Sequence, residues 1–166
     1  MDGVIIDQTE RKIVLAQKRG WIINKEDTPS DIIINKIPPG VYAEIQRDLY
    51  SDILTMKDPP LMKGVVSLLQ FFEKLRVPCI LISMRRNPEV AIALLQRHNI
   101  VPRYFSHERI FFVRETAEKN KKARELGITH YIDDEIRVLS VLPDIACRIL
   151  FDPLGVFSSA NEYLRV

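Results

Sequence analysis

Residues 119–134 read KNKKARELGITHYIDD, and this stretch decides the fold class. Its charged first half has the length of one helix, Gly127 supplies a helix stop, and a short strand is expected at 130–132. Two aspartates, Asp133 and Asp134, follow that strand directly. A helix that leads into a buried strand with polar residues at its carboxyl end is typical of an α/β protein with a parallel sheet.

The same alternation of helix and strand recurs through the second part of the chain. Periodicity and turn residues predict these elements in order: helix 61–75, strand 77–82, helix from 87, strand 109–113, helix 116–126, strand 130–132, helix 136–142 and strand 147–151. We therefore predict an α/β fold with a Rossmann-like parallel sheet.

Residues 9–58 differ from the rest of the chain, because they show helical stretches and proline turns but no clear strand. The pair Pro59-Pro60 is a candidate hinge at which this insertion returns to the sheet. The prediction is a small helical cap over residues 9–58, inserted into a core made from residues 1–8 and 59–166.

The composition describes an ordinary globular chain. It has 166 residues, 46% of them hydrophobic, and 24 basic against 22 acidic residues, so the net charge is +2. We expect neither nucleic acid nor a membrane as a partner, and the pattern makes no prediction of the oligomeric state. Cys79 and Cys147 lie in apolar runs without zinc spacing, and no export or insertion signal is present. The expected location is the cytoplasm.

Polar residues at strand ends are the candidates for chemistry, because the carboxyl ends of parallel strands face the ligand crevice. They are Asp7, Ser83, Asp133 and Asp134. Adjacent carboxylates repel each other, and Mg²⁺ is a natural partner for them. Helix capping is the alternative explanation for Ser83 and for the aspartate pair, and a solvated helix surface is the alternative for Lys119.

The order of a serine, a lysine and a strand ending in two aspartates resembles the haloacid dehalogenase (HAD) superfamily of hydrolases. Residues 80–83, ILIS, resemble its second motif, which implies that the Ser83 hydroxyl binds the transferring phosphoryl group. Residues 119–134 resemble the third and fourth motifs joined, as in the nucleotidase-like branches of the superfamily. The resemblance implies a HAD-like core under a cap.

The joined motifs also imply roles for three side chains. Lys119 would neutralise the nucleophile and the phosphate. Asp133 and Asp134 would hold magnesium, either directly or through water.

The first seven residues, MDGVIID, resemble the tail of the first motif. In that alignment Asp2 matches the aspartate that protonates the leaving group, then activates water and lies at the metal. The attacking aspartate would stand immediately before Met1. We therefore expect either a misplaced start or a truncated copy, and a second alignment makes Asp7 the nucleophile instead.

The resemblance implies magnesium-dependent hydrolysis of a phosphomonoester through an aspartyl-phosphate, by a phosphatase or nucleotidase. The substrate would be a small phosphorylated metabolite or a nucleotide. Arg85, just after Ser83, is placed to bind the anionic group of the substrate. Trp21, Tyr42 and Tyr50 of the cap could stack on a base or sugar of the substrate. The alternative is a degenerate HAD-like protein that binds metal or phosphate without catalysis.

Overall fold

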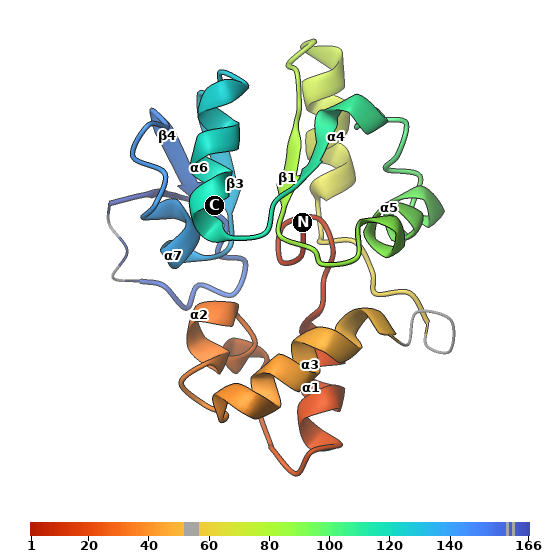
Figure 1. Cartoon of the computed structure of the whole chain (residues 1–166), viewed down its shortest axis with the longest axis vertical. Coiled ribbons are helices and arrows are strands. Elements are labelled where there is room, and N and C mark those ends of the chain that lie inside the picture. The colour runs from red at the N-terminus through yellow and green to blue at the C-terminus, as the bar shows by residue number, and fades with distance from the viewer. Residues whose placement is uncertain (52–56, 159, 161) are drawn as a thin grey trace.

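The chain folds into a helical unit and an α/β unit, which lie at opposite ends of the molecule (Figure 1). The computed structural model describes residues 1–51, 57–158, 160 and 162–166. No helix in these ranges is long and apolar enough to cross a membrane.

The elements follow one another along the chain as short helices and strands. The α-helices are α1 (Thr9–Gln17), α2 (Ser30–Ile33), α3 (Pro39–Ser51), α4 (Val65–Lys74), α5 (Pro88–Arg97), α6 (Thr116–Glu125) and α7 (Ile136–Leu139). The strands are β1 (Leu81–Ser83), β2 (Ile110–Phe112), β3 (His130–Asp133), β4 (Cys147–Leu150) and β5 (Leu164–Arg165). Two 3-10 turns, η1 (Lys25–Asp27) and η2 (His107–Arg109), complete the list.

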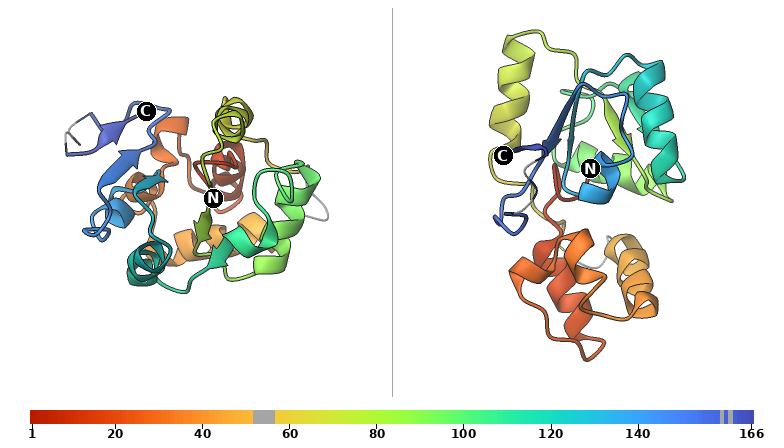
Figure 2. Two further views of the ribbon diagram at one scale, coloured as in Figure 1. Left: turned by 90° about the horizontal axis from the view of Figure 1, so that it is seen from above. Right: turned by 90° about the vertical axis from the view of Figure 1, so that its left-hand side faces the viewer.

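All paired strands are parallel, which confirms the predicted α/β class. β1 pairs with β2, and β3, β4 and β5 form a second sheet in that order. Within the described part of the chain no strand joins β1 to β3, so the strands form two separate sheets. Ile82 of β1 nevertheless packs in the same apolar cluster as Tyr131 of β3, so side chains connect the two sheets. The helical unit lies below the α/β unit in the right-hand view of Figure 2.

Local sequence explains where several helices begin and end. Asn87 accepts a hydrogen bond from the backbone N–H of Val90 at 3.4 Å, and Pro88 is the first helical residue of α5. α6 is closed by Gly127, whose φ of +64° lets its N–H donate to the carbonyl of Arg124 at 3.1 Å. Both boundaries were predicted from these residues.

One predicted strand is shorter than expected, and one strand was not predicted. The strand expected over 77–82 is present only from Leu81, because the backbone first turns at the end of α4, where the N–H of Val77 donates to the carbonyl of Phe72. β5 was not predicted. It is two residues long and is joined to the preceding loop by the N–H of Asp152, which donates to the carbonyl of Val166 at 2.7 Å.

The cap has an apolar core of its own. Its buried members come from the first three helices and the turns between them: Leu15, Ala16, Ile23, Ile33, Ile37, Ile45 and Leu49. Two further clusters lie in the α/β unit, one around α4, α5 and β1 and one around β3, β4 and α7. Each side of the split sheet therefore has a core that burial stabilises.

The chain enters and leaves the cap through two segments that lie side by side. Ile6 forms an antiparallel bridge with Leu61, and the N–H of Asp7 donates to the carbonyl of Pro60 at 2.8 Å. Asp58, next to this hinge, accepts two hydrogen bonds from Arg97 of α5, at 2.6 and 2.9 Å. The division into residues 1–8 with 59–166 and residues 9–58 stays a prediction, and residues 52–56 lie outside the described ranges.

Candidate functional site

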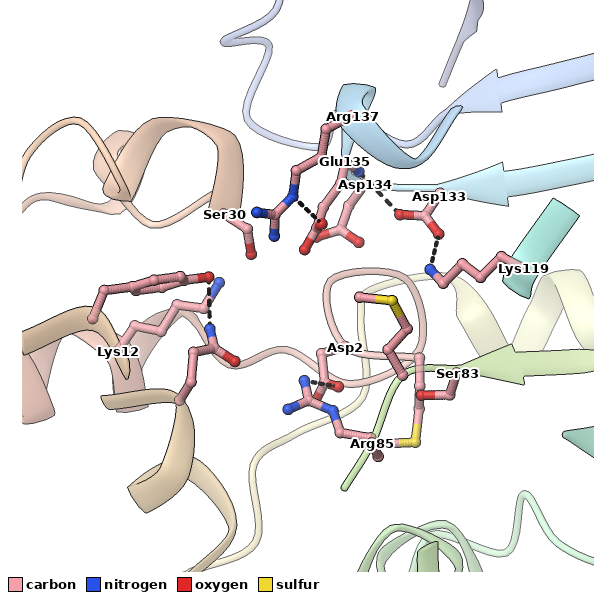
Figure 3. A pocket seen from close by; sticks show the side chains of 14 residues that line it. Asp2, Lys12, Ser30, Ser83, Arg85, Lys119, Asp133, Asp134, Glu135 and Arg137 are labelled. Atoms are coloured by element: carbon pink, nitrogen blue, oxygen red, sulfur yellow. Dashed lines mark hydrogen bonds and ion pairs between the residues drawn. The ribbon is translucent and has the colours of Figure 1, made fainter. Parts of the chain in front are cut away.

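A cavity of about 200 Å³ lies where the carboxyl ends of β1 and β3 meet the cap (Figure 3). It is lined by the following predicted site residues: Asp2, Ser83, Arg85, Lys119, Asp133 and Asp134. They come from four separate parts of the sequence, so the fold gathers them into one place.

Asp7, the alternative nucleophile, lies outside this cavity lining. Its carboxylate accepts a hydrogen bond from the backbone N–H of Thr9, the first residue of α1, at 2.9 Å. The assignment of either Asp2 or Asp7 to the first motif stays a prediction.

Lys119 and Asp133 form a buried ion pair at the floor of the cavity. The Nζ atom of Lys119 lies 2.9 Å from Oδ2 of Asp133, and the two residues are 6% and 7% exposed. The other carboxylate oxygen of Asp133 accepts from the backbone N–H of Glu135 at 3.1 Å. Lys119 is thus no part of a solvated helix surface, and its ammonium group is fixed at the end of β3.

Asp134 packs directly against Gly3. A Cβ atom on Gly3 would stand 1.9 Å from Oδ2 and 2.3 Å from Cγ of Asp134, so only glycine permits this approach. The φ of +74° at Gly3 is a second reason for glycine there. Burial, with the charges of Asp133 and Glu135, raises the pKa of Asp134 to about 7.

Ser83 is 3% exposed and ends β1, with its side chain on the cavity. Its backbone carbonyl accepts from the N–H of Val113 at 2.9 Å. Because Asn87 caps the next helix, the capping explanation for Ser83 is wrong. The hydroxyl is therefore available to a molecule in the cavity.

Asp2 is held by three side chains. Arg85 forms an ion pair with it, Gln8 donates to Oδ1 at 3.0 Å, and the Tyr50 hydroxyl donates to the same oxygen. The guanidinium carbon of Arg85 lies 4.2 Å from the centre of the Tyr50 ring. Arg85 is thereby fixed at the cavity between Asp2 and the cap helix α3.

The expected magnesium ligands do not form a metal cage in this arrangement. Within the described ranges no group of three or more His, Cys, Asp or Glu side chains could hold a metal ion. The physical reason is charge compensation, since Asp2 is paired with Arg85 and Asp133 with Lys119. The arranged side chains thus do not fit the ion, and the magnesium site of Asp2, Asp133 and Asp134 stays a prediction.

The cap contributes Tyr42, which was expected from the sequence, and Lys12 and Gln46, which were not. Lys12 is buried, its Nζ donates to the carbonyl of Thr28 at 2.8 Å, and burial lowers its pKa. Tyr42 accepts a hydrogen bond from Gln46 at 2.7 Å. The signal for Lys12 was its position one turn before the buried Leu15, on the apolar face of α1.

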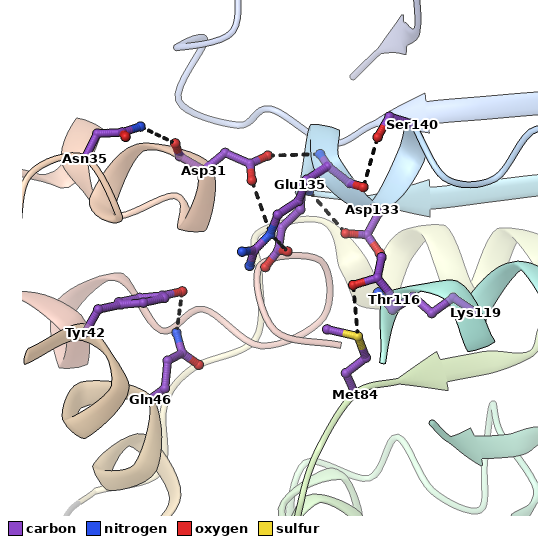
Figure 4. A network of polar contacts seen from close by, with 11 residues as sticks. Asp31, Asn35, Tyr42, Gln46, Met84, Thr116, Lys119, Asp133, Glu135 and Ser140 are labelled. Carbon is purple, nitrogen blue, oxygen red and sulfur yellow. Dashed lines mark hydrogen bonds and ion pairs between the residues drawn. The ribbon is translucent and has the colours of Figure 1, made fainter. Parts of the chain in front are cut away.

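Arg137 joins the α/β unit to the cap by ion pairs with Glu135 and Asp31. Figure 4 shows Asp31 of the cap facing Glu135 of the α/β unit. The Nε atom of Arg137 lies 2.7 Å from Oε2 of Glu135 and 3.3 Å from Oδ1 of Asp31 in α2. Burial alone would raise the pKa of Glu135, but the hydrogen bond and charge of Arg137 hold it below its usual value. This bridge closes one side of the cavity.

Solved structures with the same arrangement of elements identify the fold. A HAD hydrolase of family IA, variant 3, from Entamoeba histolytica HM-1:IMSS matches with a TM-score of 0.65 at 16% identity, over 99% of this chain and 90% of that chain. The chain has a HAD-like fold. A HAD-superfamily hydrolase from Ehrlichia chaffeensis matches this HAD-like chain with a TM-score of 0.54 at 14% identity, over 99% and 88% of the two chains.

A third match is weaker. It is a hydrolase from Streptococcus pneumoniae TIGR4, with a TM-score of 0.50 at 16% identity over 84% of this chain and 83% of that one. No family model and no curated protein sequence matches the chain. The likeness therefore concerns the fold, and it agrees with the resemblance drawn from the motifs.

Proposed function

We propose that this protein is a HAD-type hydrolase that removes the phosphoryl group from a small phosphomonoester, either a phosphorylated metabolite or a nucleotide. The observation that carries the proposal is the meeting of Ser83, Lys119 and Asp134 at one cavity, at the carboxyl ends of β1 and β3. The HAD-like fold supports it, because the same strand ends carry the resembling motifs.

The cavity offers donors to a phosphoryl group on two sides. The Ser83 hydroxyl and the Lys119 ammonium group come from the α/β unit, and Lys12 comes from the cap. Such fixed donors stabilise charge that develops on phosphoryl oxygens in the transition state, which is the main source of catalysis in phosphoryl transfer. Arg85, held by Asp2, would bind a further anionic group of the substrate.

Asp2 is proposed as the acid that protonates the leaving group, and its carboxylate lies at the cavity for that role. By the resemblance, turnover through an aspartyl-phosphate uses an attacking carboxylate that directly precedes the position of Met1. Magnesium dependence is part of the proposal, and it requires Asp2 and Asp133 to leave their cationic partners, Arg85 and Lys119, before they can hold the ion.

One observation favours a second candidate, which is phosphate binding without turnover. The carboxylates of Asp2 and Asp133 are neutralised by Arg85 and Lys119, and Asp134 is packed on Gly3. None of these three carboxylates is therefore free to attack phosphorus in this arrangement.

The test compares two forms of the chain, as printed and extended by an apolar strand that ends in aspartate before Met1. Each is assayed for hydrolysis of p-nitrophenyl phosphate with and without magnesium, and for binding of inorganic phosphate by calorimetry. Lys119→Met is the informative variant, and Lys122→Met is its matched control, because Lys122 lies on the same helix and pairs with Glu125 at the surface.

We expect the extended form to turn over, with Lys119→Met lowering the rate by roughly a hundredfold or more and Lys122→Met leaving it unchanged. Phosphate binding that depends on Lys119, without turnover by either form, would establish the second candidate. Absence of both binding and turnover, or equal effects of the two lysine variants, would contradict both functions.

A further inference from the structure

A second cavity, of about 330 Å³, lies at the opposite end of β1 from the candidate active site. It is formed where the chain leaves α4 and turns back into β1, at the end of the molecule away from the cap (Figure 1). Three arginines line it, Arg76, Arg103 and Arg109, together with a single carboxylate, that of Glu73. Its volume is in the range of small-ligand sites.

The three arginines that line this cavity are exposed. Of the described residues, none places a carboxylate within ion-pair distance of Arg76, Arg103 or Arg109, whereas Arg97 of the neighbouring helix α5 is paired with Asp58. Positive charges that converge on a cavity repel each other, so an anion that enters gains favourable interactions with all of them. Arginine is also the side chain best matched to phosphate oxygens.

Tyr104 holds one of the three arginines beside the cavity. The residue lines the cavity, but its hydroxyl is buried and out of reach of a molecule there. The guanidinium carbon of Arg103 lies 4.9 Å from the centre of the Tyr104 ring, so the two side chains are held together beside the cavity.

Arg76 stands where a helix usually has glycine. It follows the last turn of α4 with a φ of +56°, a left-handed conformation that costs a non-glycine residue about 1–2 kcal/mol. A cation at a helix C-terminus recovers about 0.3–1 kcal/mol, which is less than this cost. Arginine thus occupies a position that favours glycine, and Arg76 lines the cavity.

We propose that this second cavity binds a phosphate or pyrophosphate group of a small anionic ligand, through Arg76, Arg103 and Arg109. The site is separate from the candidate active site and does not depend on the proposed hydrolase function. A soluble compound and a lipid headgroup both carry such a group, and the two arms of the experiment distinguish these sources.

Cys79 supplies a local reporter for the test. It is a free, half-buried thiol that lines the second cavity, and the charge of Arg109 acts on it. Cys147 is also a free, half-buried thiol, but it belongs to β4 and lines neither cavity. Inorganic pyrophosphate is the soluble probe, and alkylation of each cysteine by iodoacetamide is followed by peptide mass spectrometry.

Pyrophosphate should slow alkylation of Cys79 at least tenfold at saturation while the rate at Cys147 stays unchanged. Arg103→Gln and Arg109→Gln should each abolish or weaken this protection, measured as the ratio of rates with and without pyrophosphate. Lys74→Gln is the matched control, because Lys74 lies on α4 near Arg76 but does not line the cavity, and it should retain full protection.

Vesicles of phosphatidylcholine with phosphatidic acid form the second arm, and protection by them alone would support the same phosphate site with a lipid source. No protection by either probe would overturn the proposal. Equal protection of both cysteines, or equal loss with Lys74→Gln and the arginine variants, would also overturn it, because a diffuse charge effect would then explain the result.

Discussion

Replacement of Gly3 by alanine tests the contact that places Asp134 in the cavity. An alanine Cβ at position 3 would stand 1.9 Å from Oδ2 of Asp134, so one of the two groups has to move by more than 1 Å. Overpacking of this kind costs about 1–3 kcal/mol, and the left-handed backbone adds roughly 1–2 kcal/mol. We therefore expect Gly3→Ala to lower the free energy of unfolding by about 2–5 kcal/mol.

Gly20→Ala is a matched control within the same chain. Gly20 has a φ of +80°, close to the +74° of Gly3, but nothing lies within 4 Å of the position of its Cβ. Its replacement should cost only the backbone part, about 1–2 kcal/mol. The excess loss in Gly3→Ala thus measures the contact with Asp134.

The assay is urea unfolding followed by far-ultraviolet circular dichroism, on both variants and on the unchanged chain. An Asp134→Ala background completes a double-mutant cycle, since Gly3→Ala should there cost no more than Gly20→Ala. Equal losses for the two glycine variants in the unchanged background would refute the reasoning, because the Asp134 carboxylate would then move aside without a cost in stability.

Two further predictions concern charges at the cavity. The pKa of Asp134 is raised from 3.8 to about 7, so the folded protein binds a proton at this carboxylate more tightly than the unfolded chain does. The protonated carboxyl therefore stabilises the fold fully below about pH 4, and this stabilisation is lost as the pH rises through 7. The side chain in Asp134→Asn stays neutral, so this variant should gain stability relative to the unchanged chain as the pH rises from 4 to 8, by at most about 4 kcal/mol. If urea unfolding gives the same pH dependence for both proteins, the pKa of Asp134 is not raised. Arg137→Gln removes the ion pairs with Asp31 and with the largely buried Glu135. It should therefore cost about 1–3 kcal/mol, because Glu135 loses its cationic partner, while hydrogen exchange at the α2 amides rises. Lys25→Gln, which removes the exposed pair with Glu10 within the cap, should leave that exchange unchanged.

Much of the α/β unit could be predicted because local residues mark its boundaries. Asn87 and Pro88 start α5, Gly127 ends α6, and apolar runs separate the elements. The prediction of a strand over residues 77–80 was wrong, because hydrophobicity alone does not distinguish a strand from the turn that follows α4. The division into two sheets could not be predicted either, because a sequence pattern identifies strands but not which strands pair.

The site residues divide in the same way. Ser83, Asp133 and Asp134 could be found from their positions after strands. Lys12 was missed because its helical spacing with Leu15 marks a buried face, on which a lysine is uncommon. The link between Arg137 and Asp31 joins residues 106 positions apart, and no local pattern encodes such a contact.

The two segments through which the chain enters and leaves the cap, here called the neck, link the cap to the loop that holds Asp2. The N–H of Met62 donates to the carbonyl of Ile5 at 2.8 Å, and Ile5 belongs to the same tight loop as Asp2 and Gly3. Rocking of the cap would therefore pull on the backbone of that loop through two shared hydrogen bonds, those of Met62 and Asp7. Opening for a ligand and the alignment of Asp2 would then be a single movement, so a substitution at the neck should alter binding and proton transfer together.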